Sequence, residues 1–430
     1  MLNRTVAPAA YEIQGMWLVE PQSYIWNNGL CVFTFHAPDQ PLVKAEFVFK
    51  NVFDSQKEDP LQNMALSAMM REGTSKMSSA EIAEAVDYYG AYLVPEFSFD
   101  YTSFTLYTLS KYVDQVLPIL HEIFIDAQLP ESELLTYKRT NKHSLQISLE
   151  KNEFIAKRAF YQQLFGENRY GRVTIESSLD ALNREELHRL MFSQMRPENC
   201  TLFLSGNVSE ELLQQTNNYF GERWSSLKNI ESKPSETSFR PMSAYSTDLI
   251  YQERVHSLQS AIRLGSWGLQ RTNPEFPALQ FVNTLFGGYF GSRLMRNIRE
   301  DKGYTYGISS SVVSFQHVGM IAIATQVGAE VTQSALDEIK KEMDVLQDKL
   351  ADDGEVSLVK NYLLGAMLGS LESIFSHADK FKAVYYAGLD LDYYPYYAQV
   401  IHEMDAIKVR DIAGKYLQYD AMAKVIVGKM

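Results

Sequence analysis

The stretch from Leu285 to Ser310 reads LFGGYFGSRLMRNIREDKGYTYGISS and holds the densest group of structural signals in the chain. Ser292 is one of the residue types that cap helix N-termini, and Gly303 suits the C′ position that follows a helix. The apolar spacing between them predicts a short helix from Ser292 to Lys302. Arg299 falls in the last turn of that helix, where the helix dipole favours a cation.

Tyr306 opens the next strand, predicted over Tyr304 to Phe315, and strand alternation puts it on the same face as Ile308. A tight turn at Gly303 is expected to bring the Tyr306 phenol close to the Arg299 guanidinium. Such a pair suits peptide carbonyls and a developing oxyanion, because it offers a phenol donor and a guanidinium fork. The alternative is purely structural: Arg299 pairs with a nearby acid, and Tyr306 is a half-buried strand residue.

The chain repeats one order of elements in two halves of similar size. Residues 228–248 are polar and turn-forming, which predicts a linker between an N-terminal domain of residues 1–227 and a C-terminal domain of residues 249–430. Because the strands and the long helices are segregated, the predicted fold class is α+β. We expect two homologous α/β-sandwich-type halves, each a mostly antiparallel sheet packed with several helices.

Hydrophobic periodicity places the individual elements. The first half is expected to hold a hairpin that turns at residues 27–29, strands at residues 43–50, 92–99, 101–109 and 199–205, and helices at residues 61–74, 79–89, 111–124 and 131–150. The second half is expected to hold strands at residues 259–267, 304–315, 320–327 and 422–427, and helices at residues 274–286, 292–302, 333–350, 356–374 and 394–416.

The helix of residues 61–74 carries few groups able to do chemistry. It reads as an amphipathic helix that ends at Gly73. Met64, Ser67 and Ala68 lie within about one turn of each other on it. A thioether is a soft ligand better suited to Cu(I), a serine hydroxyl is a poor zinc ligand, and alanine has no donor atom. We therefore expect this helix to hold no metal.

Taken together, these stretches resemble the insulinase/pitrilysin family of metallopeptidases, which includes mitochondrial processing peptidase. The segment from Leu285 to Ser310 is similar to the C-terminal signature of that family. The resemblance implies that Arg299 and Tyr306 reach toward the zinc domain and contact the peptide backbone near the scissile bond. Supporting similarity appears at Leu164-Phe165-Gly166 and at Tyr170-Gly171-Arg172.

The same resemblance explains why the 61–74 helix is degenerate. In this family the corresponding helix carries the inverted zinc motif His-x-x-Glu-His, and the matching positions here are Met64, Ser67 and Ala68. The third zinc ligand of the family is a glutamate on a later helix. Its matching position is Gln146, with Glu150 and Glu153 as alternatives. The resemblance therefore implies no cofactor in this chain, and zinc in a partner subunit.

Histidine placement agrees with the absence of a local zinc motif. The closest pair, His121 and His143, is 22 residues apart, so no two histidines share a helical turn.

A net charge of -13 disfavours nucleic acid as a partner, because a phosphate-binding surface is basic. Cys31 and Cys200 form no motif. No apolar stretch is long enough to span a membrane, so the expected location is cytoplasmic, or periplasmic if an N-terminal signal has been removed.

These features lead to a functional hypothesis with two rivals. The chain is expected to be the non-zinc subunit of a heteromeric metallopeptidase, inactive alone, like the non-zinc subunits of bacterial two-subunit relatives. It would bind peptide and supply Arg299 and Tyr306 to a partner that bears His-x-x-Glu-His. The first rival is an inactive scaffold or regulatory protein of the same fold, and the second is a stand-alone peptidase. A homodimer in the partner's absence is a further open alternative.

Overall fold

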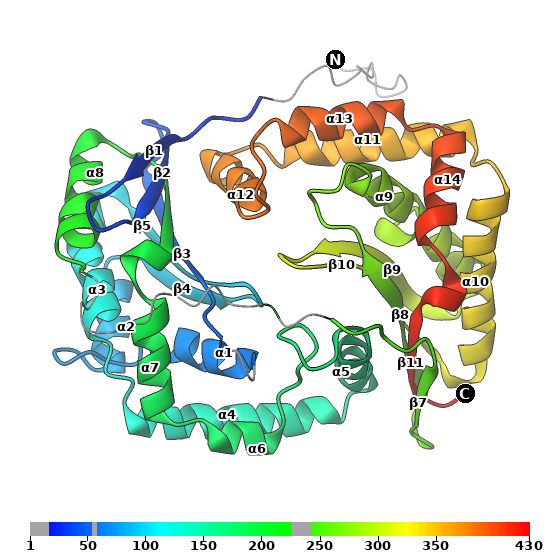
Figure 1. The fold of residues 1–430 in the computed structure, drawn as a ribbon, viewed down its shortest axis with the longest axis horizontal. Coiled ribbons are helices and arrows are strands. Elements are labelled where there is room, and N and C mark those ends of the chain that lie inside the picture. The colour runs from blue at the N-terminus through cyan, green and yellow to red at the C-terminus, as the bar shows by residue number, and fades with distance from the viewer. Residues whose placement is uncertain (1–16, 54–57, 226–238, 240–241) are drawn as a thin grey trace, which may run out of the picture.

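The computed structural model describes residues 17–53, 58–225, 239 and 242–430. Two sheets lie on opposite sides of the molecule, and helices surround them (Figure 1). Most of the linker predicted over residues 228–248 lies outside the described residues. The linker, and the division at its ends, therefore stay a prediction.

The first sheet has six strands in the order β1-β2-β6-β3-β5-β4. β2 and β6 are parallel, and the other neighbours are antiparallel. The hairpin between β1 and β2 turns at Gly29 as predicted, with a φ of 88° that glycine adopts at no steric cost. The strands are β1 (Gln22–Ile25), β2 (Cys31–His36), β3 (Leu42–Lys50), β4 (Tyr92–Phe97), β5 (Tyr101–Leu109) and β6 (Cys200–Gly206).

The second sheet has five strands in the order β7-β11-β8-β10-β9. β7 and β11 are parallel, and the other neighbours are antiparallel. The strands are β7 (Leu249–Glu253), β8 (Gln259–Gly268), β9 (Thr305–Ser314), β10 (Gly319–Gly328) and β11 (Ala423–Gly428).

The two sheets share one topology. Strands β2 to β6 and strands β7 to β11 both lie side by side in the order first, fifth, second, fourth, third along the chain. In each of these sets of five strands, the last strand along the chain lies beside the first and runs parallel to it: β6 lies beside β2, and β11 lies beside β7. This repeated order supports an internal duplication, and it confirms the predicted α+β class with two halves that are each a mostly antiparallel sheet with packed helices.

Helices cover the outer sides of both sheets (Figure 1). Leu66, Phe104 and Leu120 belong to the core of the first half, and Leu264, Phe286 and Ile339 to the core of the second. The α-helices are α1 (Pro60–Met69), α2 (Ser79–Tyr88), α3 (Val113–Asp126), α4 (Glu131–Leu149), α5 (Asn152–Phe165), α6 (Glu176–Ala181), α7 (Arg184–Gln194), α8 (Glu210–Asn217), α9 (Phe276–Asn283), α10 (Thr332–Asp348), α11 (Asp353–Gly369), α12 (Ile374–Tyr385), α13 (Tyr393–Glu403) and α14 (Ala406–Tyr416).

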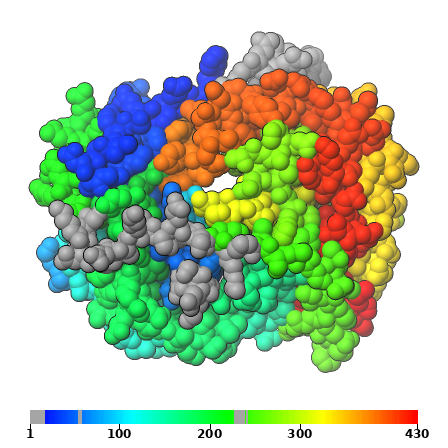
Figure 2. Space-filling view, in the orientation of Figure 1, coloured from blue at the N-terminus to red at the C-terminus, as the bar shows by residue number. Residues whose placement is uncertain are grey.

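One helix of each half packs on the sheet of the other half, and we call these two the exchanged helices. Helix α5 packs on β8 and β11 of the second sheet, where Phe160 and Leu164 share a core with Ala261 and Val425. Helix α12 packs on β2 and β6 of the first sheet, where the Phe381 ring meets Phe33 edge-on at 4.7 Å between centroids. The two exchanged helices close the chain into a ring around a central opening (Figure 2).

A cluster of charged side chains holds α12 on the first sheet. Lys44 of β3 bonds to Asp379 of α12 at 2.6 Å and to Glu46 at 3.1 Å. Lys382 of α12 bonds to Glu46 at 2.5 Å. Lys44 and Glu46 are both buried. Burial alone lowers the pKa of Lys44, but the two carboxylates outweigh it and raise that pKa, so the ammonium stays charged in the interface.

We expect Glu46→Gln to lower the free energy of unfolding by about 3 kcal/mol, because it leaves the buried Lys44 ammonium with one half-exposed partner. Urea denaturation measures this change. The matched control is Asp344→Asn, which removes an exposed pair with Lys340 and should cost less than about 0.5 kcal/mol. Equal small losses in both variants would show that the cluster does not hold α12.

Several predicted elements need correction. The helix predicted over residues 394–416 is two helices, α13 and α14, because the Asp405 side chain accepts from the Lys408 amide and starts a new helix. The helix predicted over residues 356–374 ends at Gly369, and α12 follows as a separate helix. Helices α5 to α8 and strand β7 were not predicted.

None of the described helices is both long and apolar enough to cross a membrane.

Candidate functional site

Helix α1 has a capped N-terminus and ends earlier along the chain than predicted. The Asp59 side chain accepts from the Leu61 amide at 3.0 Å, and Pro60 occupies the first turn, where its missing N–H costs nothing. The helix stops at Met69. Gly73 is therefore not its C′ residue: it has a φ of 142° and pairs as a β-bridge with Ser78.

The positions of the zinc motif on α1 offer no metal site. Met64 is 39% exposed, Ser67 is buried at 4% exposure, and Ala68 is half-buried. Only the Met64 thioether thus combines a donor atom with substantial exposure, and a thioether is a poor partner for zinc. Among the described residues no group of three or more His, Cys, Asp or Glu side chains is arranged to hold a metal ion. The residues present do not fit zinc.

A cavity of about 420 Å³ opens beside Met64, and we call it the α1–α5 cavity. Helix α4 contributes one face to it, at positions spaced three and four residues apart: Asn141, Ser144, Leu145 and Ser148. Helix α5 and the loop after it supply aromatic and basic side chains. The described lining includes no histidine, cysteine or carboxylate.

Gln146 does not reach this cavity. It lies on an exposed side of α4, and its side-chain amide donates to Glu176 at 3.1 Å. The two alternative positions are also engaged elsewhere. Glu150 bonds to Arg254 at 3.2 Å, and Glu153 bonds to Arg263 at 3.0 Å. The structure therefore brings none of the three positions proposed for the third ligand to Met64.

We expect the purified chain to contain no stoichiometric zinc, because the α1–α5 cavity lacks the ligands that zinc prefers. Metal analysis after dialysis against zinc measures this. The triple variant Met64→His, Ser67→Glu, Ala68→His should still show no peptidase activity, because the surrounding shell was not arranged for a metal. About one tightly bound zinc per unmodified chain, removable by chelator, would contradict the prediction.

The Arg299 and Tyr306 side chains lie on the second half. Arg299 belongs to a π-helical segment, Met295–Asp301, and its guanidinium lies 4.7 Å from the Phe290 ring centroid. Gly303 follows with a φ of 67°, as predicted for a glycine that ends a helix. No ion pair of Arg299 with an acid is found in the described part of the chain. The predicted approach of the two side chains to one another has no direct contact to support it.

Tyr306 points away from the core, which corrects its predicted face. It is 91% exposed, whereas Ile308 is buried. The cause is an irregularity in the pairing of β9 with β10, where the register shifts opposite Thr325 and Val327. Such a bulge places an extra residue in one strand and changes the direction of its side chains. Simple alternation, on which the prediction depended, therefore fails at this position.

Two threonines fix the bulge. The Thr305 hydroxyl donates to the Gln326 carbonyl at 2.6 Å and accepts from the Gly307 amide at 3.0 Å. The Thr325 hydroxyl donates to the Gly307 carbonyl at 2.9 Å. These bonds satisfy the backbone groups that the bulge removes from the ladder. Tyr306 is thus held outward by a defined local structure.

Tyr306 borders a polar hollow between α5 and the second sheet. Glu153 and Arg263 line the same hollow and pair with each other. The Gln326 side chain donates to Glu153 at 2.8 Å. Tyr306 therefore borders a hollow that the exchanged helix α5 also lines.

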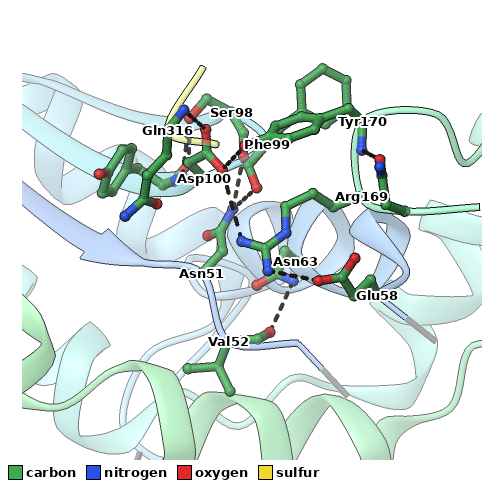
Figure 3. A network of polar contacts seen from close by, with 12 residues as sticks. Asn51, Val52, Glu58, Asn63, Ser98, Phe99, Asp100, Arg169, Tyr170 and Gln316 are labelled. Atoms are coloured by element: carbon green, nitrogen blue, oxygen red, sulfur yellow. Dashed lines mark hydrogen bonds and ion pairs between the residues drawn. The ribbon is translucent and has the colours of Figure 1, made fainter. Parts of the chain in front are cut away.

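A buried polar network joins the two halves near the α1–α5 cavity (Figure 3). Arg169 lies between two acids, at 2.9 Å from Glu58 and 3.8 Å from Asp100. The Tyr170 hydroxyl donates to Asp100 at 2.8 Å. The backbone amide of Gln316, in the second half, donates to the same carboxylate at 3.1 Å. Leu164, Phe165 and Tyr170, which belong to the two supporting stretches of the sequence, share a buried core with residues of the second sheet and so help to join the halves.

Comparisons with known proteins agree with this architecture. The family model described as "Insulinase (Peptidase family M16)" matches residues 65–178. The model described as "Peptidase M16 inactive domain" matches residues 181–363. The two matches together run from α1 through α11 and include both Arg299 and Tyr306.

Individual relatives are bacterial. A protein named "Uncharacterized zinc protease YmxG" from Bacillus subtilis is 24% identical over 354 residues, which cover 81% of this chain and 83% of that protein. A protein named "Probable inactive metalloprotease YmfF" from the same organism is 22% identical over 199 residues, which cover 46% of this chain and 45% of that protein.

Two solved structures have the same fold. The peptidase M16 inactive domain from Pseudomonas fluorescens has a TM-score of 0.85 and 20% identity, over 96% of this chain and 99% of that one. A protease from Helicobacter pylori has a TM-score of 0.86 and 15% identity, over 96% of this chain and 100% of that one. The matches to both family models, together with the degenerate positions on α1, show that this chain belongs to the insulinase (M16) peptidase family as a homologue that lacks the zinc site.

Proposed function

We propose that this chain is the non-metal-binding subunit of a heteromeric zinc metallopeptidase. In this role it encloses peptide and supplies Arg299 and Tyr306 to a zinc site carried by a second chain. The alternative is a scaffold or regulatory protein of the same fold. Arg299 and Tyr306 distinguish the two, because a scaffold has no need of an exposed phenol and of a guanidinium that pairs with no acid among the described residues.

The observation that carries the proposal is the state of Tyr306. A tyrosine that is 91% exposed contributes little to the core, yet its position is fixed by a bulge with three hydrogen bonds from two threonines. Local structure of this kind is common beside active sites, where it redirects a side chain. The phenol hydroxyl has no hydrogen-bond partner within the described residues, so it is available to a peptide carbonyl or an oxyanion.

Arg299 fits the same role. Its guanidinium stacks on Phe290, which orients the charge without neutralising it. An arginine held in this way keeps its donors for a carbonyl or a carboxylate. A partner is required because the α1–α5 cavity offers no zinc ligand, and a metallopeptidase needs three protein ligands and a general base.

Affinity capture from the native host tests the proposal. The tagged chain should be isolated with a second chain of similar length that carries His-x-x-Glu-His in its first half, and the complex should contain about one zinc. The experiment identifies the partner by mass spectrometry and measures metal in the same sample. Recovery of this chain alone, or with a partner that has no zinc motif, would favour the scaffold alternative.

A further inference from the structure

The α1–α5 cavity differs in charge from the rest of the chain. Three cationic side chains line it, namely Lys157, Arg158 and Arg172, and its described lining has no acidic residue. The whole chain, in contrast, has a net charge of -13. The other hollows with basic linings contain acids as well: Glu153 accompanies Arg263 near Tyr306, and Asp59 and Glu186 accompany Arg189 near α7.

The acids closest in sequence to Lys157 and Arg158 have partners of their own, and the third cation, Arg172, already pairs with Glu167 at 3.8 Å. Each is bonded away from Lys157 and Arg158: Glu150 to Arg254, Glu153 to Arg263, Glu167 to Arg172, and Glu176 to Gln146. Within the described residues, Lys157 and Arg158 instead lie over aromatic rings, at 5.9 Å from the Tyr161 centroid and 5.4 Å from the Phe154 centroid.

Arg158 is the more informative of the two cations. It is half-buried, and desolvation lowers the pKa of its guanidinium. Moving a cation out of water without an anion beside it is unfavourable, and natural proteins usually pair such a group. No carboxylate of the described residues pairs with this guanidinium on the cavity wall, which indicates an anionic ligand that completes the pairing.

The remaining lining indicates that the ligand also has an apolar part. Tyr137, Phe154, Tyr161 and Met64 supply apolar surface next to the cations. Asn141 and Ser144 supply hydrogen-bonding groups on the α4 side. A volume of about 420 Å³ is within the range of small-ligand sites, and is enough for a few peptide residues rather than a folded domain.

We propose that the α1–α5 cavity is a binding site for a peptide carboxylate that lies next to an apolar side chain, with Arg158 and Lys157 as its anion-binding residues. The cavity opens beside Met64, one of the degenerate positions of the family's zinc motif, and this chain would hold peptide there by charge and apolar contact. The inference rests on the part of the proposed function in which this chain encloses peptide, and it requires no partner.

The test uses the full chain alone and isothermal titration calorimetry. Three N-acetylated synthetic octapeptides rich in Ser and Gly share one Phe at the seventh position: the first has Glu after the Phe and an amidated C-terminus, the second has Gln there and is amidated, and the third has Gln there and a free C-terminal carboxylate. A carboxylate-bearing peptide should bind about ten-fold or more tightly than the neutral second peptide, because a charge-assisted hydrogen bond is gained. The first and third peptides distinguish a side-chain carboxylate from a chain terminus.

Two variants assign the site. Arg158→Gln and Lys157→Gln should each weaken binding of the preferred peptide about ten-fold. Lys157 is exposed, so its replacement leaves the fold intact, and circular dichroism verifies both variants. The matched control is Arg139→Gln, which removes the same charge from an exposed position on α4 outside the cavity and should not change binding.

Equal affinity for charged and neutral peptides, or equal effects of Arg158→Gln and Arg139→Gln, would overturn the inference. Its failure is distinguishable from failure of the proposed function. Binding here is measured on this chain alone, without a partner and without turnover. The partner and the role of Tyr306, in turn, are tested by capture and by turnover.

Discussion

In a complex reconstituted with the proposed zinc-bearing partner, Tyr306→Phe is expected to lower turnover by about 10²–10³-fold. The substitution removes one hydroxyl from a side chain that is 91% exposed, so the fold of this chain should not change. If the phenol donates to the oxyanion that develops on the scissile carbonyl, its loss raises the barrier of the chemical step. Steady-state kinetics should then show a fall in kcat that is larger than any rise in KM.

Arg299→Ala should reduce turnover at least as strongly, because in the proposed role the guanidinium also fixes the position of the peptide. The matched control is Arg296→Ala, which removes an exposed arginine from the same π-helical segment. For Tyr306→Phe the matched control is Tyr88→Phe, at a tyrosine of 81% exposure on α2. Both controls should keep nearly full turnover. Near-wild-type turnover for Tyr306→Phe and Arg299→Ala would instead support the scaffold alternative.

The strands other than β7 were predicted well because their patterns are local. Strand β5 matches the prediction at both ends, and the predicted hairpin turns at Gly29 as expected. Helices α5 and α12 were not predicted, although they close the ring. Their buried residues, such as Phe160 and Ala378, pack on the sheet of the other half. No local pattern reveals a partner surface more than 100 residues away.

At the candidate site, too, the features set by residue types could be predicted from the sequence, and those set by distant parts of the chain could not. The loss of zinc ligands at Met64, Ser67 and Ala68 can be read from residue types alone, and the structure adds only their burial. The outward direction of Tyr306 could not be predicted, because it depends on pairing with a strand 20 residues further on. The Lys157-Arg158 pair was visible in the sequence, but its meaning required α5 to be placed against α4.

Gln146 lies on a helix that lines the α1–α5 cavity, but its side chain points away from that cavity. It lies on the same helix as Ser144 and Leu145, both of which line the α1–α5 cavity. A helix turns about 100° per residue, so its cavity-facing stripe consists of positions three and four residues apart, and Gln146 lies outside the stripe of Asn141, Ser144, Leu145 and Ser148. Gln146 consequently bonds to Glu176 outside the cavity. Any counterpart of a third ligand on α4 must come from the face that carries Asn141, Ser144 and Ser148.

Activity is expected to require two chains. This chain alone should cleave no unstructured peptide, because its α1–α5 cavity has neither zinc ligands nor a general base. The partner that carries His-x-x-Glu-His should also be inactive alone, since it would lack Arg299 and Tyr306. Mixing the two purified chains with a quenched fluorescent peptide should restore cleavage. The obligate interface should bury on the order of 2,000 Å² or more.

The mixing experiment has a built-in control in the Tyr306→Phe variant of this chain. The variant should assemble with the partner as the wild-type chain does, judged by size-exclusion chromatography, and yet restore about 10²–10³-fold less cleavage. Assembly and chemistry are thereby measured separately. If the zinc-bearing chain reaches full turnover without this one, then Arg299 and Tyr306 are not needed for the reaction. The chain's role would in that case be to regulate the peptidase or to scaffold it.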